Sequence, residues 1–172
     1  MADSNTGPHV HVHPLSGRGL CITPLEGASL NDGLSFMANL SGTLAAANSA
    51  LSILATNPAT GVHHLMVECE AKKSGTFTLS EAPNATATGS SALTAVPLNR
   101  RASTTNTLTV VGNGKYTSSG TVLETHIIGG DAGPAIKTRE WVLKASTKYL
   151  ARFVANTTTV LTVLRCYIQR ES

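Results

Sequence analysis

Hydrophobic and polar residues alternate along most of the chain after residue 61. The clearest case is the segment 62–70, in which one face carries His63, Leu65, Val67 and Cys69 and the other carries His64, Met66, Glu68 and Glu70. A period of two predicts a β-strand with one buried side. The same pattern predicts further strands at 76–80, 93–98, 108–111, 121–128, 140–144, 149–155 and 160–168.

Turn-forming residues separate these predicted strands. They fall at Ser74-Gly75, Gly112-Asn113-Gly114, Ser119-Gly120, the segment 129–134 and Ala155-Asn156. Eight or more short strands at such spacing indicate an all-β fold, an antiparallel β-sandwich or jelly roll. The chain shows no strand–helix–strand rhythm and no internal repeat of solenoid length.

The segment 34–55 fits two patterns. Five apolar residues follow a helical spacing of three and four, namely Leu40, Leu44, Ala47, Leu51 and Leu54. The density of Asn, Ser, Gly and Thr between them instead favours strands and turns. On that second interpretation, strands at 34–44 and 49–56 are joined by a turn at 45–48.

The first 32 residues differ in character from the rest. Pro8, Pro14 and Pro24 stand among several glycines, a spacing that prevents a long helix or a central strand. We therefore expect an extended N-terminal arm at 1–32 that lies on its own domain or on a neighbour. Residues 33–172 are expected to form one β-sandwich domain with a single core.

The chain carries little charge. Charged residues make up 13% of its 172 residues, about half the usual quarter, and the net charge is only +3. Such a surface suits burial in an assembly, because burying hydroxyls costs less than burying charge, but ordinary β-rich domains share it. No dense basic run and no interleaved aromatic residues are present, so we expect no nucleic-acid partner.

The three cysteines are far apart and odd in number. Cys21, Cys69 and Cys166 form no Cys-x-x-Cys pair, so neither a zinc knuckle nor a disulfide framework is indicated. Cys69 and Cys166 lie in apolar strand patterns and are expected to be buried thiols. With no secretion-signal pattern and no apolar run of about 18 residues, we expect a chain kept in a reducing cytoplasm and no membrane partner.

His9, His11 and His13 are the sharpest candidates for chemistry. In an extended chain, residues two apart face the same way, so the three imidazoles would line one edge about 7 Å apart. If three chains met on a three-fold axis, rings of histidine would suit a transition metal. The alternative is a terminal arm with solvated histidines, and we expect no metal site and no cofactor. His63 and His64 point to opposite strand faces and do not share a metal.

Glu68 and Glu70 share one strand face and are the only candidates for paired catalytic carboxylates. Lys72 and Lys73 follow them directly, so a solvated or salt-bridged surface explains all four residues better than acid–base chemistry does. Nothing in this segment indicates an enzyme.

His126 is the remaining candidate for nucleophilic catalysis. Spacing alone does not assemble it into a triad with Ser118, Ser119 or Asp131, and the chain has no Gly-x-Ser-x-Gly elbow. The segment 112–115 lacks the length and the Lys-Ser/Thr ending of a phosphate loop and indicates a hairpin turn. We expect no enzymatic activity and no catalytic residues.

Two further features indicate contacts rather than chemistry. Arg100 and Arg101 lie in a polar loop, where they either meet an acidic partner surface or pin the loop onto its own domain; we favour the second. Trp141, the only tryptophan, alternates with Leu143 and is expected to anchor the core or a subunit interface.

Several short motifs, taken in order, resemble a family of small virion structural proteins of tailed bacteriophages. The motifs are Gly75-x-Phe77-x-Leu79-x-Glu81-x-Pro83, the loop Thr94 to Asn99-Arg100, Gly120-Thr121-Val122-Leu123, and Glu140-Trp141-Val142-Leu143-Lys144 with Thr147, Tyr149, Leu150 and Arg152. The resemblance covers about 61–168. Many relatives carry Asn-Arg-Asn-Arg where this chain has Asn99-Arg100-Arg101.

The resemblance implies a capsid decoration (cement) protein on the phage head. It favours strands over a helix at 34–55, a homotrimer, and the major capsid protein as partner. The protein would be made in the bacterial host cytoplasm and kept in the virion. The alternative is a tail fibre, adaptor or tail-tip component with the histidine cluster on a three-fold axis. A glycan-binding module is a third hypothesis, disfavoured because aromatic residues make up only 4% of the chain.

Overall fold

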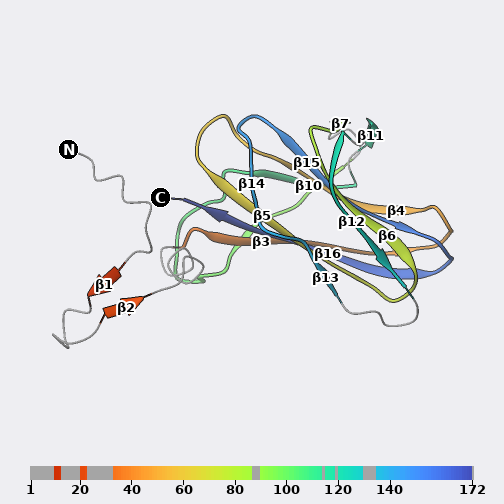
Figure 1. Cartoon of the computed structure of the whole chain (residues 1–172), viewed down its shortest axis with the longest axis horizontal. Helices are drawn as coiled ribbons and strands as arrows, with labels where there is room; N and C mark the ends of the chain where they lie inside the picture. The colour runs from red at the N-terminus through yellow and green to blue at the C-terminus, as the bar shows by residue number, and fades with distance from the viewer. Residues whose placement is uncertain are drawn as a thin grey trace.

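A computed structural model describes residues 10–12, 20–22, 33–86, 90–113, 115–118, 120–129 and 135–171. Every regular element in this part of the chain is a β-strand, and all strand pairs are antiparallel. Two six-stranded sheets carry most of the strands, and Figure 1 shows them stacked as two layers. The predicted all-β antiparallel sandwich is confirmed.

The two sheets and two smaller ladders contain all the described strands. Sheet 1 has the order β12 (Thr121–Ile128), β6 (Gly75–Glu81), β15 (Lys148–Ala155), β4 (Ala50–Thr56), β10 (Thr109–Gly112) and β8 (Ser91–Ala92). Sheet 2 has the order β13 (Ile136–Lys137), β5 (His63–Ala71), β16 (Val160–Arg170), β3 (Ser35–Leu44) and β9 (Val96–Pro97), with β14 (Trp141–Val142) also paired to β5. The small ladders are β7 (Asn84–Thr86) with β11 (Lys115–Ser118), and β1 (Val10–Val12) with β2 (Leu20–Ile22).

Strand pairing is nested along the chain. The long strand β3 pairs with the last strand β16, β4 pairs with β15, β5 pairs with β13 and β14, and β6 pairs with β12. Most strands that follow one another directly, such as β3 and β4 or β15 and β16, lie in different sheets, whereas β13 and β14 both pair with β5. The connections therefore collect at two ends of the sandwich.

At one end, which we call the loop end, segments distant in sequence meet. Backbone hydrogen bonds join Leu34 to Arg170, Val62 to Glu171, and Pro58 to Ser146 there. At the opposite end, the turn end, the turns after β3, β5 and β15 meet through bonds such as Asn156 N to Ser74 O. The C-terminus lies at the loop end, and Figure 1 shows it on the left.

The core lies between the two sheets. Inward-facing residues alternate along each long strand, as the burial of β5 and β16 shows. All three phenylalanines are at most 1% exposed, and Phe77 and Phe153 face each other across β6 and β15. The predicted inward face of β5 is confirmed, with His63 buried among its apolar neighbours.

A second, smaller cluster covers part of the outer face of sheet 1. Its buried members are Leu54, Ala85, Val111 and Leu150, against which Tyr116 packs. Ala85 and Tyr116 belong to the β7–β11 ladder, so this ladder acts as a lid over the centre of the sheet. The guanidinium of Arg152 lies 4.7 Å from the Tyr116 ring centroid, within range of a cation–π contact.

The ambiguous segment 34–55 forms two strands, β3 and β4, as the resemblance implied. Asn48 in the connecting turn has a φ of 64°, a conformation that Asn tolerates better than most residues. The leucines do not share one face: Leu44 and Leu51 lie in the core between the sheets, whereas Leu54 belongs to the smaller cluster on the outer face of sheet 1.

Two predicted strands are wrong in extent. The segment 93–98 contains only the two-residue β9, since Pro97 donates no hydrogen bond and the chain follows the edge of sheet 2. The segment 140–144 contains only β14, because its end is held by side chains instead of by a ladder. The short strands β7, β11 and β13 were not predicted, and the predicted arm at 1–32 lies outside the described residues except for the β1–β2 pair.

Gly75 provides a test of the close packing at the centre of the sandwich. A Cβ added there would overlap the Phe153 ring and lie 2.5 Å from Val154 O, which is backbone and cannot turn aside. We expect Gly75→Ala to lower the free energy of unfolding in urea by about 1–3 kcal/mol.

Gly42→Ala is the matched control, because a Cβ there lies 3.2 Å from the end of the flexible Leu51 side chain. It is expected to change stability by no more than about 1 kcal/mol. Equal stability of the two variants would contradict the packing described at Gly75.

Candidate interaction surface

The segment 98–108 between β9 and β10, here called the arginine loop, is fixed to the loop end of the sandwich. Asn99 begins it with a turn, in which its Oδ1 accepts from Arg101 N at 3.0 Å and its O accepts from Ala102 N at 3.0 Å. Thr104 Oγ1 donates to Gly33 O. Gly33 has a φ of 72°, and a Cβ there would overlap Ala102, so the two segments are in close contact.

The far side of the arginine loop is fixed by a buried histidine. His63 Nε2 lies 2.8 Å from Thr107 Oγ1, within hydrogen-bond distance. Burial, and next the charge of Arg170, lower the pKa of His63, and the Gly61 backbone opposes them only in part. His63 is therefore neutral near pH 7 and belongs to the packing of the loop.

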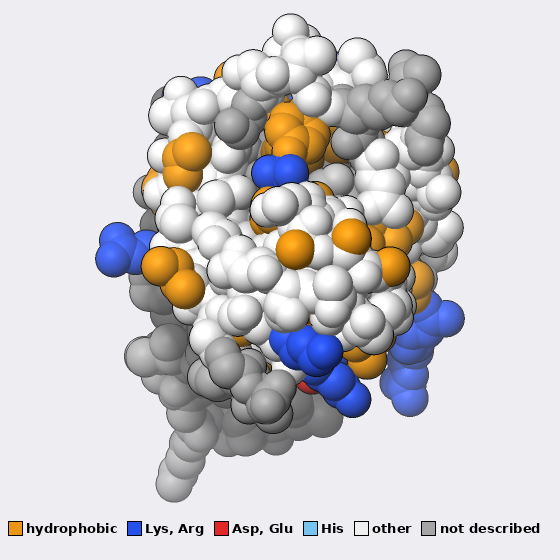
Figure 2. Space-filling view, turned by 90° about the vertical axis from the view of Figure 1, so that its right-hand side faces the viewer, with side chains coloured by type: hydrophobic (Ala, Val, Ile, Leu, Met, Phe, Trp, Pro, Cys, Tyr) orange, Lys and Arg blue, Asp and Glu red, His pale blue; other side chains and the backbone are white. Residues whose placement is uncertain are grey.

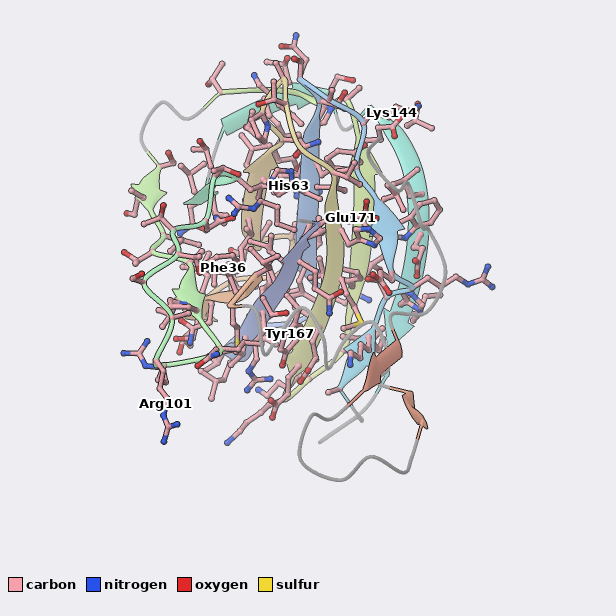
Figure 3. The ribbon with its side chains drawn as sticks, turned by 90° about the vertical axis from the view of Figure 1, so that its left-hand side faces the viewer. Phe36, His63, Arg101, Lys144, Tyr167 and Glu171 are labelled. Carbon is pink, nitrogen blue, oxygen red and sulfur yellow. The ribbon has the colours of Figure 1, made fainter. Side chains whose placement is uncertain are left out.

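The side chains of Arg100 and Arg101 are exposed and form no ion pair or hydrogen bond with any described residue. Figure 3 shows Arg101 pointing outward, away from the sheets. Within the described residues the arginines therefore do not pin the loop, in contrast to the interpretation favoured from the sequence. Asn99 and Thr104 hold the loop, and the guanidinium groups face solvent.

The described carboxylates, in contrast, are all engaged. Six glutamates lie in this part of the chain, and each accepts a hydrogen bond or ion pair from within the domain: Glu68, Glu70, Glu81, Glu124, Glu140 and Glu171. Among the described residues, the charge that is left without an internal partner is therefore positive. Figure 2, which shows the turn end, agrees, with several basic side chains in view and almost no acidic ones.

Glu68 and Glu70 form the predicted salt-bridged surface, with a different partner. Arg165 on the neighbouring β16 reaches Glu68 at 2.7 Å and Glu70 at 3.3 Å, whereas Lys72 and Lys73 make no ion pair with them. One guanidinium therefore bridges the two carboxylates on the outer face of sheet 2.

A second acidic group surrounds His64 on the outer face of sheet 2. Its Nδ1 lies 2.7 Å from Glu140 and its Nε2 lies 2.9 Å from Glu171. Both ring nitrogens thus lie within hydrogen-bond distance of a carboxylate, which fixes the orientation of the ring. The group borders a shallow depression lined also by Tyr167 and Gln169. No set of side chains suited to a metal ion occurs in the part of the chain that the structure describes.

Glu124 joins the open edges of the two sheets. It lies on β12 of sheet 1 and accepts from Trp141 Nε1 at 2.6 Å and from Arg139 N at 3.0 Å, both on the sheet 2 side. Burial acts to raise the pKa of Glu124, but the hydrogen bonds from His126, Trp141 and Arg139 together lower it. Trp141 packs against the core, as expected.

The turn at 144–148 is held in the same way. Tyr149 OH accepts from Lys144 N at 2.8 Å and donates to Glu81, which also pairs with Lys144 Nζ at 2.6 Å. Asn57, buried in the neighbouring connection, donates to Lys144 O at 2.9 Å. Three residues of the sequence motifs described above, Glu81, Lys144 and Tyr149, thus stabilise this turn through contacts with one another.

The catalytic candidates do not assemble. His126 contacts Glu124 at 2.9 Å and no serine, while Ser119 and Asp131 lie outside the described residues. Burial raises the pKa values of Cys69 and Cys166 to about 12, so both are inert thiols as predicted.

The predicted histidine cluster lies largely outside the described residues. His9 and His13 lie outside the described residues, and His11 is described only as backbone in β1.

Comparisons of the chain with models of protein families, with curated proteins and with solved structures find no match. In the part of the chain that the structure describes, no helix is long and apolar enough to cross a membrane. The architecture and the exposed arginine loop together define a β-sandwich with a candidate interaction surface at its loop end. Residues of different sequence motifs, such as Glu81 and Lys144, are in contact in this fold.

Removal of the Glu124 charge is expected to weaken the link between the sheets. Because the pKa of Glu124 is lower when folded, its stabilisation is present above about pH 4.3 and is lost as pH falls through the folded-state pKa. Glu124→Gln should lower the free energy of unfolding by about 1–3 kcal/mol at pH 7. The difference from wild type should shrink below pH 4.

Glu70→Gln is the control for this comparison, since Glu70 is 49% exposed and its pair with Arg165 is screened by solvent. Denaturant unfolding at several pH values measures both variants. A Glu124→Gln deficit that stays constant down to acid pH would show that the charge of Glu124 is not what joins the sheets.

Proposed function

We propose that this protein is a capsid decoration protein of a tailed bacteriophage, which binds the outside of the assembled head and stabilises it. The observation that carries the proposal is the loop end, where the loop that bears the exposed Arg100 and Arg101 contacts Gly33 through Thr104 and Ala102. A domain built this way presents a loop and a terminal segment on one side, as a protein that docks on a lattice requires.

The motif resemblance supports this proposal through the roles of its residues. Gly75 and Phe77 are in the most crowded part of the core, and Glu81 and Tyr149 hold the turn before β15. Motifs whose residues meet in space fit a shared fold better than chance similarity of separate segments.

We further infer that the sandwich is a jelly roll. Its eight principal strands pair first with last and then inward, as an antiparallel ribbon does when it is rolled into two sheets. The inserted strands β7 to β11 lie between the fourth and fifth of these strands. Viral capsid domains are among the proteins that use this architecture.

On this proposal, many copies bind where subunits of the major capsid protein meet. The N-terminal segment adds strand pairing or groove contacts to its neighbours, and the β-domain supplies a homotrimer interface. Many sites on one symmetric shell make a modest affinity per contact sufficient, because the second and third contacts of a trimer are intramolecular. The shell is thereby supported against the pressure of packaged DNA.

A tail component is the second candidate function, favoured by the spacing of His9, His11 and His13. Glycan binding is the weakest candidate, because the described aromatic side chains are already engaged. The phenylalanines and Tyr149 are buried, Trp141 bonds Glu124, Tyr116 packs on Arg152, and Tyr167 lies beneath Lys137. No free ring remains among them on which a sugar would stack.

Immunogold labelling of phage particles whose genome encodes this chain tests the proposal directly. We expect gold over the heads of intact virions, at many positions per particle. Label confined to tails would replace the proposal with the tail component. Particles that contain the chain in no position would overturn both.

Light scattering of the purified chain tests the trimer. We expect three times the 17.8 kDa mass of one chain, unchanged by a chelator. A trimer that dissociates on chelation would support the histidine cluster and the tail location. A monomer at all concentrations would contradict an intrinsic trimer.

A further inference from the structure

We propose that the surface formed by Val96, Leu98, Arg100 and Arg101, here called the arginine surface, binds a carboxylate-rich patch on a partner protein. The inference rests on the proposed function only for the identity of that partner, which would then be the capsid shell. The acidic chemistry of the partner follows from the charges and contacts of this chain.

The charge argument begins with the inserted segment. Residues 82–123 contain no Asp or Glu, yet they carry Arg100, Arg101 and Lys115. The six described glutamates are all engaged elsewhere in the domain, so none compensates the two arginines. Two adjacent, uncompensated guanidinium groups repel each other, and an external pair of carboxylates relieves that repulsion.

The arginine loop is also preorganised for binding. Asn99 fixes the turn that carries the arginines, Thr104 and Ala102 join it to Gly33, and Thr107 joins it to His63. Binding therefore does not have to order the backbone of the loop, which lowers its entropic cost. Since the side chains of Arg100 and Arg101 make none of these contacts, their substitution is expected to leave the loop in place.

Apolar side chains flank the arginines on the same surface. Along β9 and the start of the loop, exposed and less exposed residues alternate, so Val96, Leu98 and Arg100 point outward together. Val96 is 38% exposed and Leu98 is 41% exposed. Apolar residues beside arginine are typical of protein interfaces, where arginine is enriched and lysine is depleted.

A protein fits this surface better than a nucleic acid does. The guanidinium fork matches a carboxylate with two parallel hydrogen bonds. A nucleic-acid site needs a longer basic stripe and exposed rings for stacking, and the described rings are engaged. Two arginines next to a valine and a leucine suit a compact acidic and apolar epitope.

Lys72 and Lys73 at the turn end provide the matched control. They are also adjacent cations, they make no ion pair, and Lys73 only donates to Thr158 O at 3.1 Å. Leu161, 40% exposed, lies beside Lys72, so this pair also has an apolar neighbour and differs chiefly in carrying ammonium groups instead of guanidinium forks. A general preference for anions would use both pairs, whereas the proposed site uses only the arginines.

The first experiment compares full-length variants on phage heads assembled without this chain, by co-sedimentation at several salt concentrations. Arg100→Glu with Arg101→Glu should weaken binding by roughly tenfold or more and reduce its salt dependence. Lys72→Glu with Lys73→Glu should bind like wild type. Arg100→Lys with Arg101→Lys should recover only part of the loss, since lysine lacks the fork.

The second experiment does not depend on the shell. Amide NMR shifts of the wild-type chain are followed during titration with poly-L-glutamate and, separately, with duplex DNA. Shifts centred on residues 96–102 with poly-L-glutamate, and weaker ones with DNA, support the inference. Equal shifts at residues 72–73, or a stronger response to DNA, would overturn it. Heads that fail to bind the wild-type chain would contradict the proposed function, while the titration still decides the inference.

Discussion

The pairing of Phe77 with Phe153 across β6 and β15, at the centre of the sandwich, is the constraint on which the rest of the structure depends. Both side chains are fully buried on adjacent strands of sheet 1, and Gly75 is a glycine because the Phe153 ring occupies the space that a side chain would need. With aromatic residues at only 4% of the chain, the core uses all three phenylalanines. The surface is consequently built from small hydroxyl-bearing side chains, which agrees with its low charge.

Nested strand pairing turns separated segments into neighbours. Glu124 meets Trp141, Glu81 meets Lys144, and His64 meets Glu140 and Glu171, each pair bridging elements that are not consecutive. These polar contacts lie at edges and connections, where ladders alone leave backbone groups exposed. Because the described glutamates bind within the domain, none of them pairs with Arg100 or Arg101. The nested strand pairing therefore determines both the fold and which charges remain exposed on this surface.

Alternation of residues was sufficient to predict long strands such as β5 and β16, because each buries one face in a single core. It did not predict β7 and β11, whose few residues pack on the outside of a sheet and show no period. The role favoured for Arg100 and Arg101 also differs from the structure, in which Asn99 forms the turn and Thr104 joins the loop to Gly33, a contact that no local pattern encodes. The sequence shows that residues 82–123 contain no Asp or Glu. Only the structure shows that each described glutamate is bound elsewhere and so does not neutralise Arg100 or Arg101.

The separation of the loop end from the turn end has a practical consequence for display. A peptide fused before Gly33 would emerge beside the arginine loop, where it would compete with docking on the shell. The turn at 72–74 lies at the opposite end, and Lys72 is exposed there. In the proposed orientation, cargo inserted into that turn would project from the particle into solvent. If the domain reinforces a head as proposed, it would then also serve as a carrier, with one end for attachment and one for presentation.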